Sequence, residues 1–293
     1  TMPLLGQNAT GAGMELHNLA MLALTMALAV LWLRAPDEDR LSLLVVGAIL
    51  LAQSRYESVL FSVAAAGVIA TGWWRARRMV LPWALLATPL LLIPWAWHSR
   101  IVDSRPQLWE LREGESARFS WRYVSGNLEG AWEFFRSVSP GQPGSLALVL
   151  LGMAGAFALV ARILRRSPAP LPARAVAVAW VGLGVAAHFV VVQFYYWARF
   201  DEPVTARFAL PSLLILALLS GVLVRLAPFP RPVVLRAAFA GWMIWLVASG
   251  GPAFAQRLYT ERNLVRHEVE WEVAQARARR GPVLVITSKA TLP

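Results

Sequence analysis

Cysteine is absent from this chain of 293 residues, which excludes disulfides, thiol chemistry and cysteine-based metal sites. Lysine is almost absent as well: Lys289 is the only one, so arginine supplies nearly all of the basic charge behind the net +11. Charged residues make up 15% of the chain, whereas a soluble domain carries roughly a quarter. Hydrophobic residues reach 57% and fall in long runs with almost no charge inside them. The composition therefore predicts an integral membrane protein. In such a protein, arginines between the apolar runs indicate membrane orientation by the positive-inside rule and not nucleic-acid binding.

The apolar runs predict about eight membrane spans, because a helix needs roughly 20 apolar residues to cross the hydrocarbon core. We expect them at 14–33, 41–54, 58–74, 80–97, 146–163, 175–197, 208–224 and 233–250. The stretch 41–74 is too long for one span, since a single helix would measure about 50 Å against a core of roughly 30 Å. A break at Arg55-Tyr56-Glu57 resolves this, but the short first arm then has to be buried among other helices.

Arginines gather in alternate loops between the predicted spans. They are Arg34, Arg40, Arg75, Arg77, Arg78, Arg162, Arg165, Arg166, Arg174, Arg225, Arg231 and Arg236. The positive-inside rule places these loops in the cytoplasm, and both termini and the segment 98–145 then lie outside. Within that segment, 128–136 has the pattern of a helix lying in the membrane interface. The segment is either a solvated loop with aromatic anchors or a lid over a lipid-facing site.

The expected fold is an all-α, polytopic transmembrane helical bundle over 1–255, with a helical extracytoplasmic loop at 98–145. Residues 256–293 are expected to begin an extracytoplasmic C-terminal segment: 256–280 reads as one polar helix, and the apolar run 283–288 reads as the first strand of a small soluble α/β unit. The chain starts Thr-Met-Pro-Leu-Leu without a basic leader and stops just after that run. We therefore expect it to be a piece of a longer protein.

Two polar groups lie at the expected outer ends of the first spans. Glu15 lies with His17 and Asn18 at the start of the first span, either as a helix-capping carboxylate beside a snorkelling histidine or as a carboxylate that holds a sugar hydroxyl or a metal ion. Arg55-Tyr56-Glu57 lies between two apolar arms, where charge is costly unless it is paired or functional. Either Arg55 and Glu57 form a local pair that closes the hairpin, or Arg55 holds a phosphate and Glu57 orients it.

A third group combines aromatic residues with both signs of charge. The run 195–203 reads YYWARFDEP and contains Tyr196, Arg199, Asp201 and Glu202, and Arg207 follows it. Aromatic faces stack on sugar rings, carboxylates accept hydrogen bonds from hydroxyls, and guanidinium groups bind phosphate. The alternative is an ordinary aromatic belt with a solvated loop.

The remaining classes of site receive little support. The four histidines are scattered along the chain, and no spacing resembles a zinc site or a catalytic triad. His188 falls in the middle of a predicted span, and we interpret it as a satisfied core histidine.

The three outer groups resemble motifs of membrane glycosyltransferases of the GT-C superfamily. The run TGAGME that ends at Glu15 looks like their "S/T-G-M-E" start, and Arg55-Tyr56-Glu57 is similar to their "R-P-E/D" turn. The run RFALP from Arg207 to Pro211 resembles their "R-[YF]-x-x-P" entry to a late span. The nearest resemblance is to arabinofuranosyl- and mannosyltransferase-like members that use polyprenyl-phosphate sugars.

The resemblance implies an inverting enzyme that moves a sugar from a polyprenyl-phosphate donor to a glycan, lipid or protein acceptor outside a prokaryotic inner or plasma membrane. Residues expected to hold the donor phosphate are Arg55, Arg199 and Arg207. Residues expected to contact sugar or acceptor are Glu15, His17, Tyr56, Glu57, Tyr196, Asp201 and Glu202.

The catalytic residue stays unassigned. Such enzymes place an aspartate base in the first external loop, and none lies near the start here, so either that segment lies upstream of Thr1, as we expect, or this copy is inactive. No cofactor is expected; a divalent metal ion at these carboxylates is compatible with the chemistry but not required by it. The alternatives are a non-catalytic membrane assembly subunit and a transporter of a lipid-linked sugar.

Overall fold

The computed structural model describes residues 15–104, 117–138, 146–165, 171–200 and 205–226, together with short helical stretches between 233 and 278. This part of the chain is mostly helical and has no strand, only an isolated antiparallel bridge between Phe119 and Tyr195. Five of its helices are long and apolar enough to cross a membrane: Glu15–Arg34, Glu57–Ala76, Leu146–Leu164, Ala173–Gln193 and Ala206–Arg225. The prediction of a helical membrane protein is confirmed at this level. The eighth predicted span and the C-terminal segment fall largely outside the described residues.

The first two helices, α2 (Glu15–Arg34) and α3 (Glu38–Ser54), form a tight hairpin. Asp37 caps α3, because its carboxylate accepts a hydrogen bond of 2.8 Å from the backbone N–H of Arg40. Farther along, the Thr25 hydroxyl donates 3.1 Å to the carbonyl oxygen of Gly47, which shows how closely the two helices approach. Both Leu41 and Leu44 on α3 are fully buried. The short arm expected from the sequence is thus packed among neighbouring helices, as its length requires.

The predicted break at Arg55 is confirmed. Helix α3 ends at Ser54, and Arg55 adopts an extended conformation (φ −155°, ψ 145°). A 3₁₀ turn, η1 (Tyr56–Val59), then leads into α4 (Leu60–Ala76). The chain reverses here, so the Arg55 side chain leaves the backbone at the tip of a helical hairpin.

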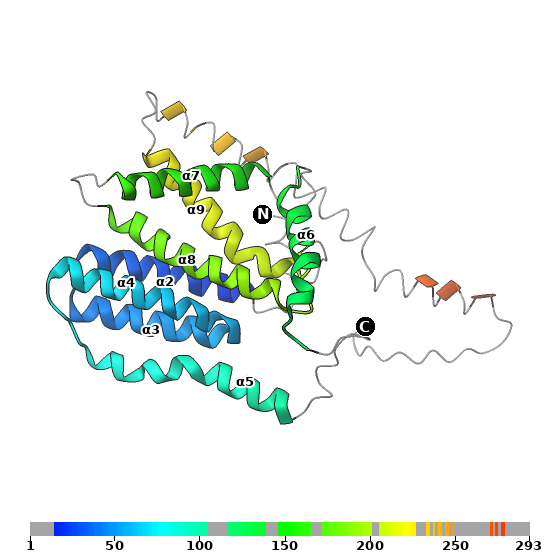
Figure 1. Ribbon diagram of the computed structural model, residues 1–293, viewed down its shortest axis with the longest axis horizontal. Coiled ribbons are helices and arrows are strands. Elements are labelled where there is room, and N and C mark those ends of the chain that lie inside the picture. The colour runs from blue at the N-terminus through cyan, green and yellow to red at the C-terminus, as the bar shows by residue number, and fades with distance from the viewer. Residues whose placement is uncertain are drawn as a thin grey trace.

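The predicted span at 80–97 differs from the structure. It consists of a 3₁₀ helix, η2 (Trp83–Leu92), followed by α5 (Ile93–Ser104). Pro89 lies inside η2 and lacks a backbone N–H, which disfavours a regular α-helix there. The second piece extends seven residues past the expected end of the span at Trp97. In Figure 1, α5 runs along the outside of the layer formed by α2, α3 and α4.

The second half of the bundle contains α7 (Leu146–Leu164), α8 (Ala173–Gln193) and α9 (Leu210–Leu226). In Figure 1, α8 lies between the first helices and the α7–α9 pair. Helices α7 and α9 touch through glycine: a Cβ added at Gly155 would lie 2.0 Å from the carbonyl oxygen of Leu219, and one at Gly152 would lie 2.9 Å from that of Leu216. A step of three residues along α7, from Gly152 to Gly155, matches a step of three along α9, from Leu216 to Leu219. The two helices therefore run in the same direction.

Helix α6 (Val124–Phe135) crosses the end of the bundle (Figure 1). The Asn127 side-chain amide donates hydrogen bonds of 2.8 Å to the carbonyl oxygens of Gln193 and Tyr195, where α8 ends. The preceding segment pairs with the same region, since the Ser120 N–H lies 2.9 Å from the Phe194 carbonyl oxygen. The helix predicted at 128–136 is therefore present, and it is fastened to the C-terminus of α8.

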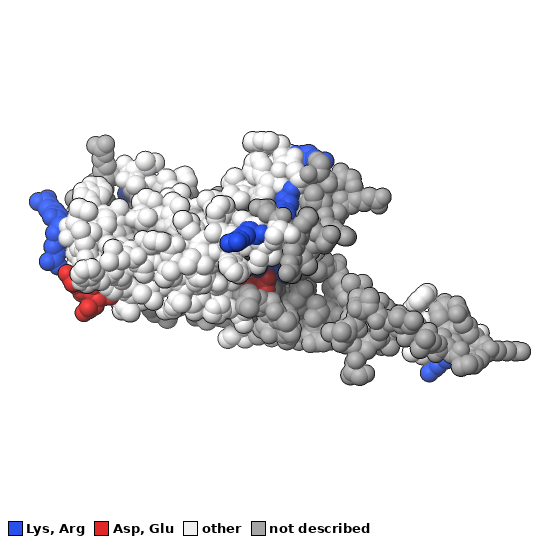
Figure 2. All heavy atoms as spheres, turned by 90° about the horizontal axis from the view of Figure 1, so that it is seen from below, with Lys and Arg blue, Asp and Glu red and all other residues white. Residues whose placement is uncertain are grey.

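The arginine-rich loops meet at one end of the bundle, here called the arginine end. Its described arginines are Arg34, Arg40, Arg75, Arg77, Arg78, Arg162, Arg165, Arg174 and Arg225. Arg75 donates 2.9 Å to the Leu171 carbonyl, and Arg78 donates 3.1 Å to that of Pro36, which ties three loops together. Figure 2 shows charge of both signs gathered at this end, a largely uncharged stretch along the bundle, and further charged residues toward the opposite end.

Candidate functional site

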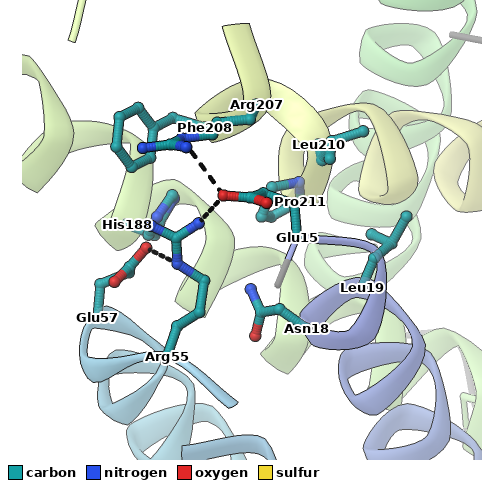
Figure 3. Close-up of a pocket in the computed structure, with 10 residues that line it drawn as sticks. All are labelled: Glu15, Asn18, Leu19, Arg55, Glu57, His188, Arg207, Phe208, Leu210 and Pro211. Atoms are coloured by element: carbon teal, nitrogen blue, oxygen red, sulfur yellow. Dashed lines mark hydrogen bonds and ion pairs between the residues drawn. The ribbon is translucent and has the colours of Figure 1, made fainter. Parts of the chain in front are cut away.

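A small pocket lies at the opposite end of the bundle from the arginine end, where four distant parts of the chain converge (Figure 3). The starts of α2 and α9, the turn after α3 and the last turns of α8 all contribute side chains. The residues that line it are Glu15, Asn18, Leu19, Arg55, Glu57, His188, Arg207, Phe208, Leu210 and Pro211.

Arg55 binds two carboxylates at once. Its Nη1 lies 2.5 Å from Oε1 of Glu15, and its Nε lies 2.5 Å from Oε1 of Glu57. All three side chains are largely buried, with exposed fractions of 14%, 7% and 14% for Arg55, Glu15 and Glu57. The local Arg55–Glu57 pair considered from the sequence is therefore present. It is only half of the arrangement, because Arg55 also reaches the start of α2.

Arg207 approaches the same carboxylate from the other side. It lies in the 3₁₀ turn η5 (Ala206–Ala209) that leads into α9, and its Nε is 3.3 Å from Oε1 of Glu15. The guanidinium carbons of Arg55 and Arg207 lie 5.6 and 5.5 Å from the ring centroid of Phe208, within cation–π range. Glu15 thus bridges two arginines that share one aromatic ring.

The electrostatics of this group are balanced. Two guanidinium groups face two carboxylates, and pairing of this kind offsets the cost of removing each charge from water. A phosphate offers the same negative oxygens as a carboxylate and fits the guanidinium fork equally well. An anionic ligand would therefore compete with Glu15 for Arg55 and Arg207.

Asn18 explains why Glu15 faces Arg55. Its Oδ1 accepts hydrogen bonds of 2.7 Å from the hydroxyls of both Ser54 and Ser58, which flank the hairpin turn. Glu15 lies one helical turn before Asn18 on α2, so fastening Asn18 to the turn brings the Glu15 carboxylate beside Arg55. The two serines were not singled out from the sequence, although their positions beside a predicted turn mark them as capable of this role.

Other residues expected at the site lie elsewhere. His17 is exposed and Arg199 is exposed, and neither is among the residues lining the pocket. The Arg199 carbonyl oxygen accepts a hydrogen bond from the Thr205 hydroxyl. Tyr196 is half-buried, with its ring centroid 4.9 Å from that of Tyr195. The structure therefore brings together two of the three arginines expected to converge.

Three further expectations fall outside the described part of the chain. Asp201 and Glu202 are not among the described residues, and the side chain of Tyr56 is not described.

His188 was not expected at the site. Helix α8 ends at Gln193 instead of continuing to residue 197, so His188 lies about 8 Å from the end of its helix rather than in the middle of a span. The imidazole is 2% exposed and stacks on Phe61, with ring centroids 5.8 Å apart. Its burial agrees with the interpretation of a core histidine, but its Nδ1 has no hydrogen-bond partner in the described structure. His188 was missed because the predicted span ended at residue 197, four residues past the end of α8 at Gln193.

An apolar groove of about 780 Å³ adjoins the pocket, between α6, α7, α8 and α9. Helix α6 supplies Leu128, Trp132 and Phe135 to one of its walls. On α9, Ser212 of the groove follows Pro211 of the pocket directly. On α8, Phe189 of the groove follows His188 of the pocket. The charged pocket and the apolar groove therefore share α8 and α9, and the groove continues toward the arginine end, where Val178 and Ile163 line it.

Within the described residues, no three or more histidine, aspartate or glutamate side chains are grouped closely enough to hold a metal ion. Comparisons of the chain with protein-family models, with curated proteins and with solved structures each found no match.

Proposed function

We propose that this protein transfers a sugar from a polyprenyl-phosphate donor to a glycan, lipid or protein acceptor at the extracytoplasmic membrane face, as GT-C glycosyltransferases do. One observation carries the proposal: the guanidinium groups of Arg55 and Arg207 converge at the end of a helical bundle, beside an apolar groove. A lipid-linked phosphate needs both features, one for its anionic head and one for its chain.

The paired arginines suit the charge that develops in such a reaction. The donor leaves as a polyprenyl phosphate, and cationic groups aimed at the departing oxygens stabilise the transition state. Guanidinium groups also bind the phosphate before transfer, through two parallel hydrogen bonds. We assign donor binding and leaving-group stabilisation to Arg55 and Arg207.

Glu15 and Glu57 are assigned to positioning. Both are ion-paired to Arg55, so their charge already serves to orient a guanidinium group. Transfer also requires a general base for the acceptor hydroxyl. We expect that base to come from outside this group of residues, as the resemblance to GT-C enzymes implies.

The apolar groove suits the isoprenoid chain. Its volume of about 780 Å³ lies in the range of ligand sites. The chain of the donor would run from the charged pocket along α8 and α9, below the crossing helix α6. The orientation rests on the arginine end, which the positive-inside rule assigns to the cytoplasm.

The test is sugar transfer in membranes that contain this protein. Radiolabelled pentose and hexose donors linked to polyprenyl phosphate are supplied, and label in glycan, lipid and protein is measured. We expect transfer by the wild type and its loss in Arg55→Ala and Arg207→Ala. Arg34→Ala and Arg78→Ala, at the arginine end, serve as matched controls.

Two outcomes would contradict the proposal. Equal transfer by the site and control variants would remove Arg55 and Arg207 from the reaction. Donor binding without transfer of any sugar would support a non-catalytic subunit or a transporter instead.

A further inference from the structure

Glu57 and His188 each bury a polar atom without a hydrogen-bond partner, and both residues line the same pocket (Figure 3). The atoms are Oε2 of Glu57 and Nδ1 of His188. Buried polar atoms in proteins are almost always hydrogen-bonded, because leaving one unpaired forfeits its interaction with water. A third such atom in the pocket, Nε of Arg207, lies 3.3 Å from Oε1 of Glu15, so the atoms of Glu57 and His188 are the two that a further polar group could bind.

The packing of η1 and α4 against α8 brings these two residues into the same pocket. Glu57 lies in the 3₁₀ turn η1, four residues before Phe61 on α4, and His188 follows Gly184 by four residues on one face of α8. A Cβ added at Gly184 would lie 3.3 Å from Cδ1 of Phe61, which shows how closely the helices approach. Phe61 also stacks on His188. The two helices run in opposite directions, so the step from Phe61 to Glu57 and the step from Gly184 to His188 lead to the same end of the bundle.

The pocket has room for a small group. Its volume is about 10 Å³, close to the space that one water molecule needs. A single hydroxyl oxygen is of this size. A phosphate is larger, so it would reach Arg55 and Arg207 only by displacing the carboxylate of Glu15.

We propose that Glu57 and His188 form a subsite for one hydroxyl group of the sugar carried by the donor. This inference rests on the function proposed above. A hydroxyl donates one hydrogen bond and accepts others, so it can donate to Oε2 of Glu57 while accepting from a protonated Nδ1 of His188. Arg55 holds the other carboxylate oxygen of Glu57 and so keeps Oε2 in place. The subsite thus recognises one hydroxyl of the sugar, while Arg55 and Arg207 bind the phosphate.

The test compares a polyprenyl phosphate without a sugar and the same lipid carrying one of three sugars. Purified protein is titrated with undecaprenyl phosphate and with undecaprenyl phosphate carrying mannose, glucose or arabinofuranose. The His188→Phe substitution keeps an aromatic ring beside Phe61 and removes the polar atom. We expect it to weaken binding of the best sugar-bearing lipid roughly tenfold, the effect of losing one buried hydrogen bond. Binding of undecaprenyl phosphate should change less than about twofold, which also shows that the variant is folded.

Deoxysugar donors provide the second measurement. Removing the recognised hydroxyl from the sugar should weaken binding to the wild type but not to His188→Phe, because the contact is already lost in the variant. His188→Gln retains polar atoms and should lie between the two. If His188→Phe fails to bind undecaprenyl phosphate, the deoxysugar series with wild type and His188→Gln decides the question.

The outcomes separate the two proposals. If the wild type binds neither kind of lipid, the proposed function fails, and the subsite fails with it. If the wild type binds both lipids, and a His188→Phe protein that still binds undecaprenyl phosphate has both affinities weakened equally or neither weakened, the subsite alone is overturned and the pocket holds only water. The subsite is overturned in the same way if no deoxysugar donor distinguishes the wild type from the variants.

Discussion

Oε1 of Glu15 lies 2.5 Å from Nη1 of Arg55, although forty residues separate them in the chain. This contact joins the first residue of α2 to the turn after α3, and both side chains are largely buried. The same Glu15 oxygen lies 3.3 Å from Nε of Arg207. The ion pair is therefore a structural link between three helix ends, and it marks the position that an anionic ligand would take.

Removing the charge of Glu15 should destabilise the bundle. In Glu15→Gln, Arg55 keeps only Glu57 and Arg207 loses its carboxylate partner, and breaking a buried ion pair costs about 3–5 kcal/mol. The free energy of unfolding, measured in detergent micelles, should fall by an amount of that order. His17→Gln, on the exposed side of the same helical turn, is the control and should change little. Similar stabilities for the two variants would contradict the structural role of Glu15.

Arginine at position 55 should not be replaceable by lysine. The guanidinium of Arg55 contacts Glu15 and Glu57 through two different nitrogen atoms, whereas lysine has a single ammonium group. We expect Arg55→Lys to weaken binding of undecaprenyl phosphate by roughly tenfold or more. Arg207→Lys should weaken it less, because the Arg207 side chain is 31% exposed and makes one longer contact with Glu15. Equal effects in a binding titration would show that the fork of Arg55 is unimportant.

Filling the apolar groove should impair binding in proportion to the length of the isoprenoid chain. Ala186 lines the groove on α8, and Ala187 is the next residue, also exposed but not part of the groove. Ala186→Trp should weaken binding of undecaprenyl phosphate while sparing a short geranyl phosphate. Ala187→Trp should leave both affinities unchanged. If chain length makes no difference to the effect of Ala186→Trp, the groove does not hold the chain.

The fastening of α6 should depend on Asn127. Its amide donates to two carbonyl oxygens at the end of α8, and its side chain is buried. In Asn127→Asp the donors are lost and a carboxylate faces those carbonyls, at a cost of about 2 kcal/mol or more. Hydrogen exchange of α6 amides should rise in this variant and stay unchanged in Glu129→Gln, an exposed position on the same helix. Unchanged protection in both would mean that α6 is held by its apolar contacts alone.

Glycine at position 155 should be required for the contact between α7 and α9. An added methyl group would meet the backbone of Leu219, which cannot move aside as a flexible side chain can. Gly155→Ala should therefore force the helices apart and lower the temperature of unfolding. Gly221→Ala is the matched control: an added Cβ there meets nothing within 4 Å, and alanine favours a helix over glycine by up to about 1 kcal/mol. A stable Gly155→Ala protein would rule out this close approach.

Several features of the fold follow from local sequence alone. Long apolar runs determine where helices form, and the arginine-bearing loops between them collect at one end of the bundle. The break at Arg55 was predictable because one helix over 41–74 exceeds the thickness of a bilayer. The break inside 80–97 was not, because an apolar run indicates burial and does not distinguish a 3₁₀ from an α-helix. The end of α8 at Gln193 was also missed, since the aromatic residues that follow continue the hydrophobic pattern.

The sequence identified four charged residues of the site as candidates, because a charged side chain beside an apolar run is costly unless it is paired or functional. They are Glu15, Arg55, Glu57 and Arg207. Their meeting in one pocket is decided by tertiary structure, through the Asn18 hydrogen bonds that dock α2 on the hairpin turn. His188 reaches the same pocket because Gly184 lets α4 approach α8 closely. Sequence by itself determined which segments are apolar and where charge collects, since both are properties of neighbouring residues. Only the packing of helices decided that Glu15 pairs with Arg55 and Arg207, because those contacts join residues forty or more positions apart.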